Sequence, residues 1–384
     1  MKLPVISSIG KTFGLAVAFS AALSVGAPAE AGPSAGYELE TVAQGLSFPW
    51  NVAFLSDGTV LLTELDGRLR AVRDGVLDPT PIAGVPAVFR ESQGGLFDVV
   101  PHPDFDANRL LYLSYAYGDG RANATRVARA KFDGSSLSDL EVIFEATPLK
   151  DTPVHYGGRI AFSPDGKLFV TVGDGFNYRE EAQKRSNMLG SIIRLNDDGS
   201  VPPDNPFVGQ EGIRPEIFSY GHRNQQGLVI TEAGLVYANE HGPRGGDEIN
   251  LIEAGKNYGW PVITYGLDYS GARISPFTEM EGMEQPIKYW VPSIAPASLE
   301  LYTGTLFPAW QGDFLVAGLV PGDVRRVDME GGVAVGEEIL FAEIGSRIRG
   351  VKMAPDGSVY ILTDGEEGAV LRATPAGPGN GVSF

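Results

Sequence analysis

The chain has 384 residues, no cysteine and a formal net charge of −18. Without cysteine it cannot form disulfides or thiolate metal sites, so any metal must be bound by oxygen or imidazole, and oxygen ligands favour calcium or magnesium. The acidic balance argues against a nucleic acid partner, and 50 glycines and 27 prolines argue against long helices.

The first 31 residues have the plan of a secretory signal peptide. Two lysines are the only charges before Glu30, an apolar stretch of small residues covers 13–25, and Ala29-Glu30-Ala31 supplies an A-x-A cleavage site. We expect cleavage after Ala31, export to the periplasm or the exterior, and one mature domain over 32–384. An uncleaved anchor is the alternative, but a membrane span needs about 20 strongly apolar residues. The stretch is shorter than that, and no later segment of the sequence fits a span.

One unit recurs along the rest of the chain: a short apolar strand, a tight turn and a second apolar strand. Three copies contain an Asp-Gly turn, which is a strong hairpin signal. The six copies are centred near Phe54, Val100, Phe162, Val229, Phe307 and Met353.

Six hairpins at uneven, blade-sized intervals predict an all-β fold, a six-bladed β-propeller with four-stranded antiparallel blades. The alternative is a pair of β-sandwiches whose hairpins are similar by accident. Uneven spacing implies long loops, and long loops on a rigid scaffold usually carry function. One polar stretch, over 178–190, is expected to form a short helix within such a loop.

Three of the four histidines lie in polar clusters, and histidine is the side chain whose proton moves most easily near neutral pH. His155 opens HYGGR just before the third hairpin, and Asp174 follows the second strand of that hairpin in VTVGDG. A carboxylate beside an imidazole fixes its tautomer and raises its basicity. The alternative is a structural histidine that caps a strand.

The other two clusters are GHRNQQG over 221–227 and EHGPRGGDE over 240–248. The first contains Arg223, whose planar fork suits carboxylate or quinone oxygens. Its amides would be costly to bury without partners, so the run is either exposed or bound to something polar. The glycines of the second allow main-chain carbonyls to converge on a hard cation. A plain turn is the alternative there.

Together and in this order, HYGGRIAFSPDG, GDG, SYGHRNQQGL, EHGPRGGDEINLI and NYGWP resemble the soluble glucose/sorbosone dehydrogenase family. The resemblance runs over about residues 45–373 and is strongest to the bacterial periplasmic aldose sugar dehydrogenases. It implies a six-bladed propeller that oxidises the C1 hydroxyl of aldose sugars to lactones. The cofactors implied are pyrroloquinoline quinone (PQQ), which accepts the hydride, and calcium.

The resemblance also assigns roles to residues. His155 matches the general base, Asp174 the carboxylate that orients it, and Arg223 the guanidinium over the reacting quinone carbonyl, where negative charge grows. Gly242 and Pro243 match the pair whose main-chain carbonyls hold the cofactor's calcium. The residues matching cofactor contacts or their neighbourhood are Gln93, His155, Arg223, Asn224, Gln226, Tyr269, Arg347 and Arg349. The residues that look like ligands of a second, structural calcium are Glu248 and Tyr258.

The sequence departs from the soluble glucose enzymes of the family in two places. Val320 and Pro321 stand where those enzymes have a cofactor-binding lysine, and Val154 stands where they have an aspartate before the base. Both changes put the contacts of the glucose enzymes in doubt, whereas neither affects the residues of proton transfer.

Two other functions compete with sugar oxidation. A calcium-dependent propeller lactonase would use His155 to activate water, but it would have no tricarboxylate for the arginine-rich motifs to hold. A non-catalytic propeller that binds a carbohydrate or a protein would not need the base and the Arg-Asn-x-Gln run together. The preferred aldose, the natural electron acceptor and the choice between a monomer and a homodimer stay open.

Overall fold

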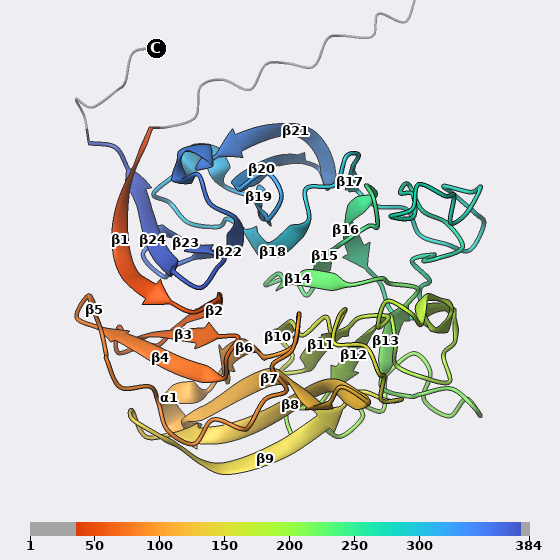
Figure 1. Ribbon diagram of the computed structural model, residues 1–384, viewed down its shortest axis with the longest axis horizontal. Helices are drawn as coiled ribbons and strands as arrows, with labels where there is room; N and C mark the ends of the chain where they lie inside the picture. Colours follow the sequence, from red (N-terminus) through yellow and green to blue (C-terminus); the bar gives the residue numbers. More distant parts are fainter. Residues whose placement is uncertain (1–35, 378–384) are drawn as a thin grey trace, which may run out of the picture. The chain divides into compact units, whose positions relative to one another are not determined.

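The structure, a computed structural model, describes residues 36–377, so the predicted signal peptide lies outside the described residues. These residues form six sheets of four antiparallel strands set around a central axis (Figure 1). The sequence prediction of a six-bladed β-propeller is therefore confirmed. Within residues 36–377 no helix combines the length and the apolar character needed to cross a membrane.

The first three blades are consecutive meanders in which each strand pairs with the next one along the chain. Blade 1 consists of β2 (Pro49–Phe54), β3 (Val60–Glu64), β4 (Arg68–Arg73) and β5 (Val76–Leu77). Blade 2 consists of β6 (Leu96–Pro101), β7 (Leu110–Asp119), β8 (Ala122–Phe132) and β9 (Leu137–Glu145), with the short helix α1 (Phe105–Asn108) after β6. Blade 3 consists of β10 (Ile160–Phe162), β11 (Leu168–Val172), β12 (Ser191–Leu195) and β13 (Ile217–Tyr220).

The last three blades follow the same plan, except that the final blade takes its fourth strand from the N-terminal side. Blade 4 consists of β14 (Gln225–Ile230), β15 (Val236–Glu240), β16 (Asp247–Ile252) and β17 (Lys288–Trp290). Blade 5 consists of β18 (Pro296–Leu301), β19 (Phe314–Gly318), β20 (Asp323–Glu330) and β21 (Val333–Leu340). Blade 6 consists of β22 (Ile348–Met353), β23 (Val359–Thr363), β24 (Gly368–Pro375) and β1 (Tyr37–Leu46).

The strand β1 closes the ring. It pairs antiparallel with β24 from Tyr37 opposite Pro375 to Leu46 opposite Gly368. Figure 1 shows this as the red strand beside the blue one. The closure pairs the outer edge of β24, which would otherwise offer unpaired backbone groups to another chain.

The predicted Asp-Gly turns join the first two strands of their blades. Gly58, Gly166 and Gly357 have φ of 85°, 76° and 86°, in the left-handed region that favours glycine. In the first of these turns, Asp57 accepts a hydrogen bond from the amide of Thr59, 2.9 Å away. The hairpin signals of the sequence therefore correspond to real turns.

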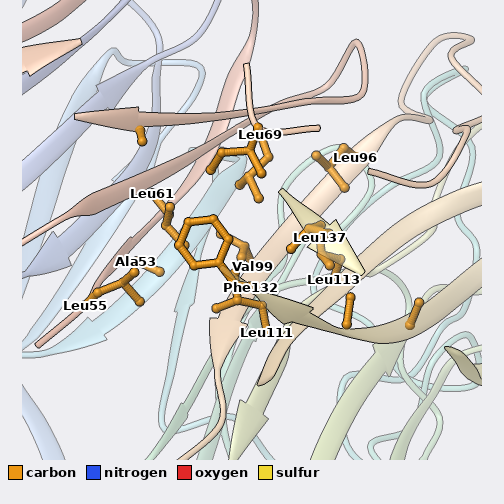
Figure 2. Packing of buried hydrophobic residues seen from close by; sticks show 14 of the residues in the cluster. Ala53, Leu55, Leu61, Leu69, Leu96, Val99, Leu111, Leu113, Phe132 and Leu137 are labelled. Carbon is orange, nitrogen blue, oxygen red and sulfur yellow. The ribbon is translucent and has the colours of Figure 1, made fainter. Parts of the chain in front are cut away.

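Hydrophobic side chains fill the spaces between blades, because both faces of each sheet pack against a neighbour. Figure 2 shows one such cluster, in which Leu61 and Leu69 of blade 1 meet Val99, Leu111 and Phe132 of blade 2. The first strands of the blades contact one another around the axis, as β14 contacts β18 and β18 contacts β22. The loops that precede these inner strands therefore meet at one end of the central channel.

Two local predictions had different outcomes. The prediction of a hairpin centred on Phe307 is wrong, because the inner strand of blade 5 is β18 and Phe307 precedes the 3-10 turn η2 (Pro308–Trp310). Phe307 is buried and stacks on Trp310 at 3.9 Å between ring centroids. The loop is therefore apolar because it packs in the core, and its sequence has the same apolar pattern as a strand. The short loop helix expected over 178–190 is confirmed as the 3-10 turn η1 (Arg179–Gln183). The remaining 3-10 turn is η3 (Ala342–Ile344).

Candidate active site

A cavity of about 380 Å³ lies at the end of the channel where the inner strands begin. This volume falls within the range of small-molecule sites. Val320, at the position where the sequence departs from the glucose enzymes, is also in its wall. The predicted cofactor residues that line it are Gln93, Asn224, Gln226, Arg347 and Arg349.

His155 and Asp174 form a buried pair, with 2.7 Å between Nδ1 of the imidazole and Oδ1 of the carboxylate. The backbone amide of Phe176 donates to Oδ1 over 2.8 Å, and the indole N–H of Trp260 donates to Oδ2 over 2.7 Å. Burial alone would raise the pKa of Asp174, but His155 and Arg223 outweigh it and lower that pKa. The carboxylate is therefore ionised and accepts the Nδ1 proton.

The pairing leaves His155 as a neutral imidazole with its lone pair on Nε2. Burial lowers the pKa of His155, and the positive charges of Arg223 and Lys150 lower it further, whereas Asp174 opposes them. A neutral imidazole with a fixed tautomer is suited to accept a proton. The predicted base and its orienting carboxylate are thus brought together as the sequence indicated.

The HYGGR loop holds His155 in an unusual backbone conformation, with φ of 52°. Gln93 fixes it, because its Oε1 accepts the amide N–H of His155 over 2.8 Å. Gly157 has φ of 67°, and a Cβ there would lie 2.6 Å from the carbonyl oxygen of Thr171. The first glycine of the motif is therefore a requirement of close backbone packing.

Arg223 reaches across the site from the GHRNQQG segment. Its Nη1 donates to the carbonyl oxygens of His241 (3.1 Å) and Gly242 (2.8 Å). Its Nη2 lies 3.4 Å from the hydroxyl of Tyr269, which is mostly exposed at the rim. The guanidinium therefore joins blade 4 to the long loop that follows β16.

Glu240, a carboxylate to which the sequence analysis gave no role, holds the backbone of Arg223 in place. Its Oε2 accepts the amide N–H of Arg223 over 2.5 Å, and its Oε1 lies 2.8 Å from Nδ1 of His222. The other imidazole nitrogen lies 2.9 Å from the hydroxyl of Ser219. His222, although it belongs to a polar cluster, is a fully buried structural residue.

The amides of GHRNQQG are buried, so the exposed alternative for this run is excluded. Oδ1 of Asn224 accepts the amide N–H of Gly157 over 3.1 Å, and Nε2 of Gln226 donates to the carbonyl of Gly157 over 3.2 Å. Both residues also line the cavity. They tie the loop of the base to blade 4 and leave polar atoms beside a bound molecule.

Arg347 and Arg349 share a single carboxylate, Asp364. Their Nε atoms lie 3.1 and 3.4 Å from its two oxygens. The Arg347 side chain is 55% exposed and that of Arg349 only 14%, and burial lowers the pKa of Arg349. The cavity wall therefore carries an excess of positive charge, which suits an anionic ligand.

Three of the four residues predicted to bind metal, Gly242, Glu248 and Tyr258, line a second, much smaller cavity of about 20 Å³, and Pro243 does not. Burial and Glu240 raise the pKa of Glu248 to about 8. The Tyr258 hydroxyl donates to the carbonyl of Leu251 over 2.6 Å, so its main chain is what remains for a cation. In the described part of the chain, no group of three or more imidazole or carboxylate side chains is arranged to hold a metal.

A larger cavity of about 960 Å³ lies at the opposite end of the channel and contains none of the predicted site residues. Arg159, the last residue of HYGGR, lies between the two ends. It donates to the carbonyls of Gln226 (2.6 Å) and Ala297 (2.8 Å) and lies 3.8 Å over the ring of Trp50. Arg159 and Trp50 thus form a floor beneath the smaller, arginine-lined cavity.

Three features of the site were not assigned from the sequence. Trp260 lies within the NYGWP motif and Glu240 within EHGPRGGDE, so each had a motif but no predicted role. His241 lines both small cavities, and its Nε2 has no partner in the structure. Burial and nearby positive groups lower its pKa to about 3, so it is a neutral imidazole.

Comparison with known proteins identifies the family to which the chain belongs. A family model described as Glucose / Sorbosone dehydrogenase matches residues 46–372. The aldose sugar dehydrogenase YliI of Escherichia coli (strain K12) is 40% identical over 345 residues, covering 88% of this chain and 92% of that protein. The solved apo-form structure of a soluble aldose sugar dehydrogenase from Escherichia coli has a TM-score of 0.86 at 38% identity, covering 89% of this chain and 100% of that one. The PQQ-bound aldose sugar dehydrogenase from Streptomyces coelicolor has a TM-score of 0.73 at 27% identity, covering 89% and 99%. The chain therefore belongs to the glucose/sorbosone dehydrogenase family.

Proposed function

We propose that the protein is a PQQ-dependent aldose sugar dehydrogenase that oxidises the C1 hydroxyl of aldoses to lactones. The observation that carries this proposal is the buried His155–Asp174 pair, because the residues that follow His155, Tyr156 and Gly157, line the same cavity as Arg347 and Arg349. The relatives add support, because one is named an aldose sugar dehydrogenase and another was solved in a PQQ-bound form.

The residues of the cavity fit PQQ by charge and by hydrogen-bonding capacity. The cofactor has three carboxylates, and Arg347 and Arg349 have only Asp364 between them. The amides of Asn224 and Gln226 would lie against its polar edges. When bound, PQQ would supply an ortho-quinone that takes the hydride from C1 of the sugar.

His155 would take the other hydrogen of the sugar as a proton. Its Nε2 accepts the proton of the C1 hydroxyl, while Asp174 holds Nδ1 and stabilises the imidazolium that forms. The sugar thus loses one hydride and one proton, and its C1–OH becomes the lactone carbonyl. Arg223 supplies a fixed positive charge where negative charge grows, and such preorganised donors usually contribute strongly to catalysis.

Calcium is part of the proposal. The main-chain carbonyls of Gly242 and Pro243 would hold the ion next to the cofactor, and Glu248 with the main chain of Tyr258 would hold a second one. The cavity of about 20 Å³, lined by Gly242, Glu248 and Tyr258 together, is of the right order for one small ion or water and so supports one of these two ions. Glu248 lies near Glu240 in a buried setting, where a divalent cation would compensate the two charges. Export to the periplasm remains a proposal from the sequence.

Reconstitution tests the function against its two rivals. The metal-free protein is mixed with PQQ and calcium, and dye reduction is followed with a panel of aldoses. Sugar-dependent dye reduction that requires PQQ is the expected result. Lactone hydrolysis without PQQ would identify a lactonase instead. Sugar binding by calorimetry without either activity would identify a non-catalytic propeller.

A further inference from the structure

We propose that Lys150 is a positioning residue whose buried ammonium group keeps the imidazole of His155 unprotonated and fixes the loop that carries it. The catalytic consequence rests on the proposed function, whereas the effect on His155 does not require substrate or cofactor.

Lys150 is an almost fully buried cation, with 3% of its surface exposed. Its Nζ donates to Oδ1 of Asn123 over 2.8 Å and to the carbonyl oxygen of Thr152. It also lies 3.5 Å from the centre of the Tyr156 ring. These partners are neutral, so none of them cancels the positive charge, and burial keeps that charge unscreened by water.

The contacts of Lys150 reach the backbone neighbours of both members of the pair. Tyr156 follows His155 directly, and its hydroxyl donates over 2.7 Å to the same Asn123 oxygen that accepts from Lys150. On the other side, the hydroxyl of Thr152 donates over 2.6 Å to the carbonyl of Gly175, the residue after Asp174. A Cβ on Gly175 would lie 2.7 Å from Cδ of Lys150, so the lysine stem packs directly against that residue.

The charged groups around the imidazole come from different elements. Asp174, just after β11, favours the protonated imidazole, while Arg223, just before β14, disfavours it. Lys150, after β9, adds a second positive charge against protonation. His241, after β15, also interacts with His155 but is itself neutral.

The amino group of Lys150 is positively charged at the acidic pH values at which His155 titrates. Burial lowers the pKa of Lys150 to about 7, and Asp174 and Asp151 oppose that change. Below that pH the lysine is positive, and the pKa of His155 is lowered below its usual 6.5. Removing the charge at position 150 should therefore raise the pKa of His155.

The first experiment is an NMR pH titration of the imidazoles in the cofactor-free protein, which has only four histidines. The His155 signals are identified by their loss in His155→Gln. Lys150→Met removes the charge, Lys150→Arg keeps it, and Lys131→Met is a control because its side chain is 60% exposed in blade 2. We expect Lys150→Met alone to raise the pKa of His155, by at least about half a unit.

An unchanged His155 titration in a folded Lys150→Met protein overturns the proposal. If that variant does not fold, the wild-type titration decides. The His155 carbon signals should then show a second inflection near pH 7, from deprotonation of Lys150. Its absence overturns the proposal as well.

The second experiment separates this inference from the proposed function. In the reconstituted enzyme, Lys150→Met should move the acid limb of kcat/KM to higher pH, in addition to any loss of the alkaline plateau from the freed loop, and Lys150→Arg should restore the wild-type limb. A merely structural lysine would lower the plateau without moving the limb, which contradicts the proposal. Absence of any PQQ-dependent sugar oxidation would refute the function but leave the NMR result to stand or fall by itself.

Discussion

Trp260 donates its indole N–H to Oδ2 of Asp174, although the two residues are 86 positions apart in the chain. Asp174 lies in the connection between β11 and β12 of blade 3, whereas Trp260 lies in the long connection between β16 and β17 of blade 4. The orientation of the His155 imidazole therefore depends on a loop that belongs to another blade.

Trp260→Phe tests this dependence. The change keeps an aromatic ring but leaves Oδ2 without its donor, and an unsatisfied buried acceptor costs about 1–3 kcal/mol. We expect kcat to fall by about tenfold, with little change in PQQ affinity. Trp310→Phe is the matched control, because Trp310 is also buried and its Nε1 has no partner in the structure. Equal effects of the two variants on kcat would contradict a role for the indole N–H.

His155→Gln should lower turnover by about 10²–10⁴-fold, the usual loss for a general base. PQQ binding should persist, because the imidazole acts on the sugar proton rather than on the cofactor. Single-turnover kinetics and a PQQ titration by fluorescence measure the two effects separately. Near-normal turnover would remove His155 from the mechanism.

The pH profile of kcat/KM should show an acid limb with its midpoint below 6.5. Burial and nearby cations lower the pKa of His155 below that value, and the base must be neutral to accept a proton. Activity should therefore rise with pH through this midpoint and then level off. A limb centred above 6.5 would show that another group limits the reaction.

The three arginines should divide between binding and catalysis. Arg349→Ala should weaken PQQ affinity by more than about tenfold, roughly one charged contact, and Arg347→Ala should do so less because Arg347 is more exposed. Arg223→Ala should lose turnover even with saturating PQQ. Arg244→Ala, exposed in the same motif as Gly242, is the control. The same affinity loss and residual rate in all three variants would refute this division.

Calcium should stabilise the protein through Glu248. Burial and Glu240 raise the pKa of Glu248 from 4.5 to about 8. Because the folded protein holds the proton of Glu248 more tightly than the unfolded chain does, protonation of Glu248 stabilises the fold. This contribution to the free energy of unfolding is complete below about pH 4.5 and is lost as pH rises through about 8. Glu248→Gln should therefore raise the melting temperature of the metal-free protein at pH 8 by on the order of 2–5 °C and weaken its stabilisation by calcium.

Differential scanning fluorimetry with EDTA or calcium measures both effects. Glu253→Gln, a change to an exposed carboxylate of the same blade, is the control. A wild-type melting temperature that does not respond to calcium would argue against the metal site.

Local patterns were enough to predict the ring of blades. Asp-Gly turns depend on neighbouring residues alone, so Gly58, Gly166 and Gly357 could be identified directly. Blade 5 shows the limit, because buried aromatic packing around Phe307 gives the same apolar pattern as a strand. The true inner strand, β18, begins with Pro296 and lacks that pattern.

The site likewise contains residues that the sequence identified and residues that only the fold reveals. His155, Asp174 and Arg223 were found through motifs whose residue types suit the chemistry. The donors and charges that adjust them, Trp260, Glu240 and Lys150, act across loops that only the folded ring brings together. No spacing rule connects residue 260 with residue 174, so their contact could not be predicted from the sequence.

The closure of blade 6 has a consequence for the order in which the protein is made. Ribosomes release the strand β1 first and its partner β24 last among the strands described. Throughout synthesis one edge of β1 therefore stays unpaired, and such edges readily pair with strands of other chains. The ring cannot lock until nearly the whole chain has emerged. The time between the two events is a period of aggregation risk that lengthens with slow translation.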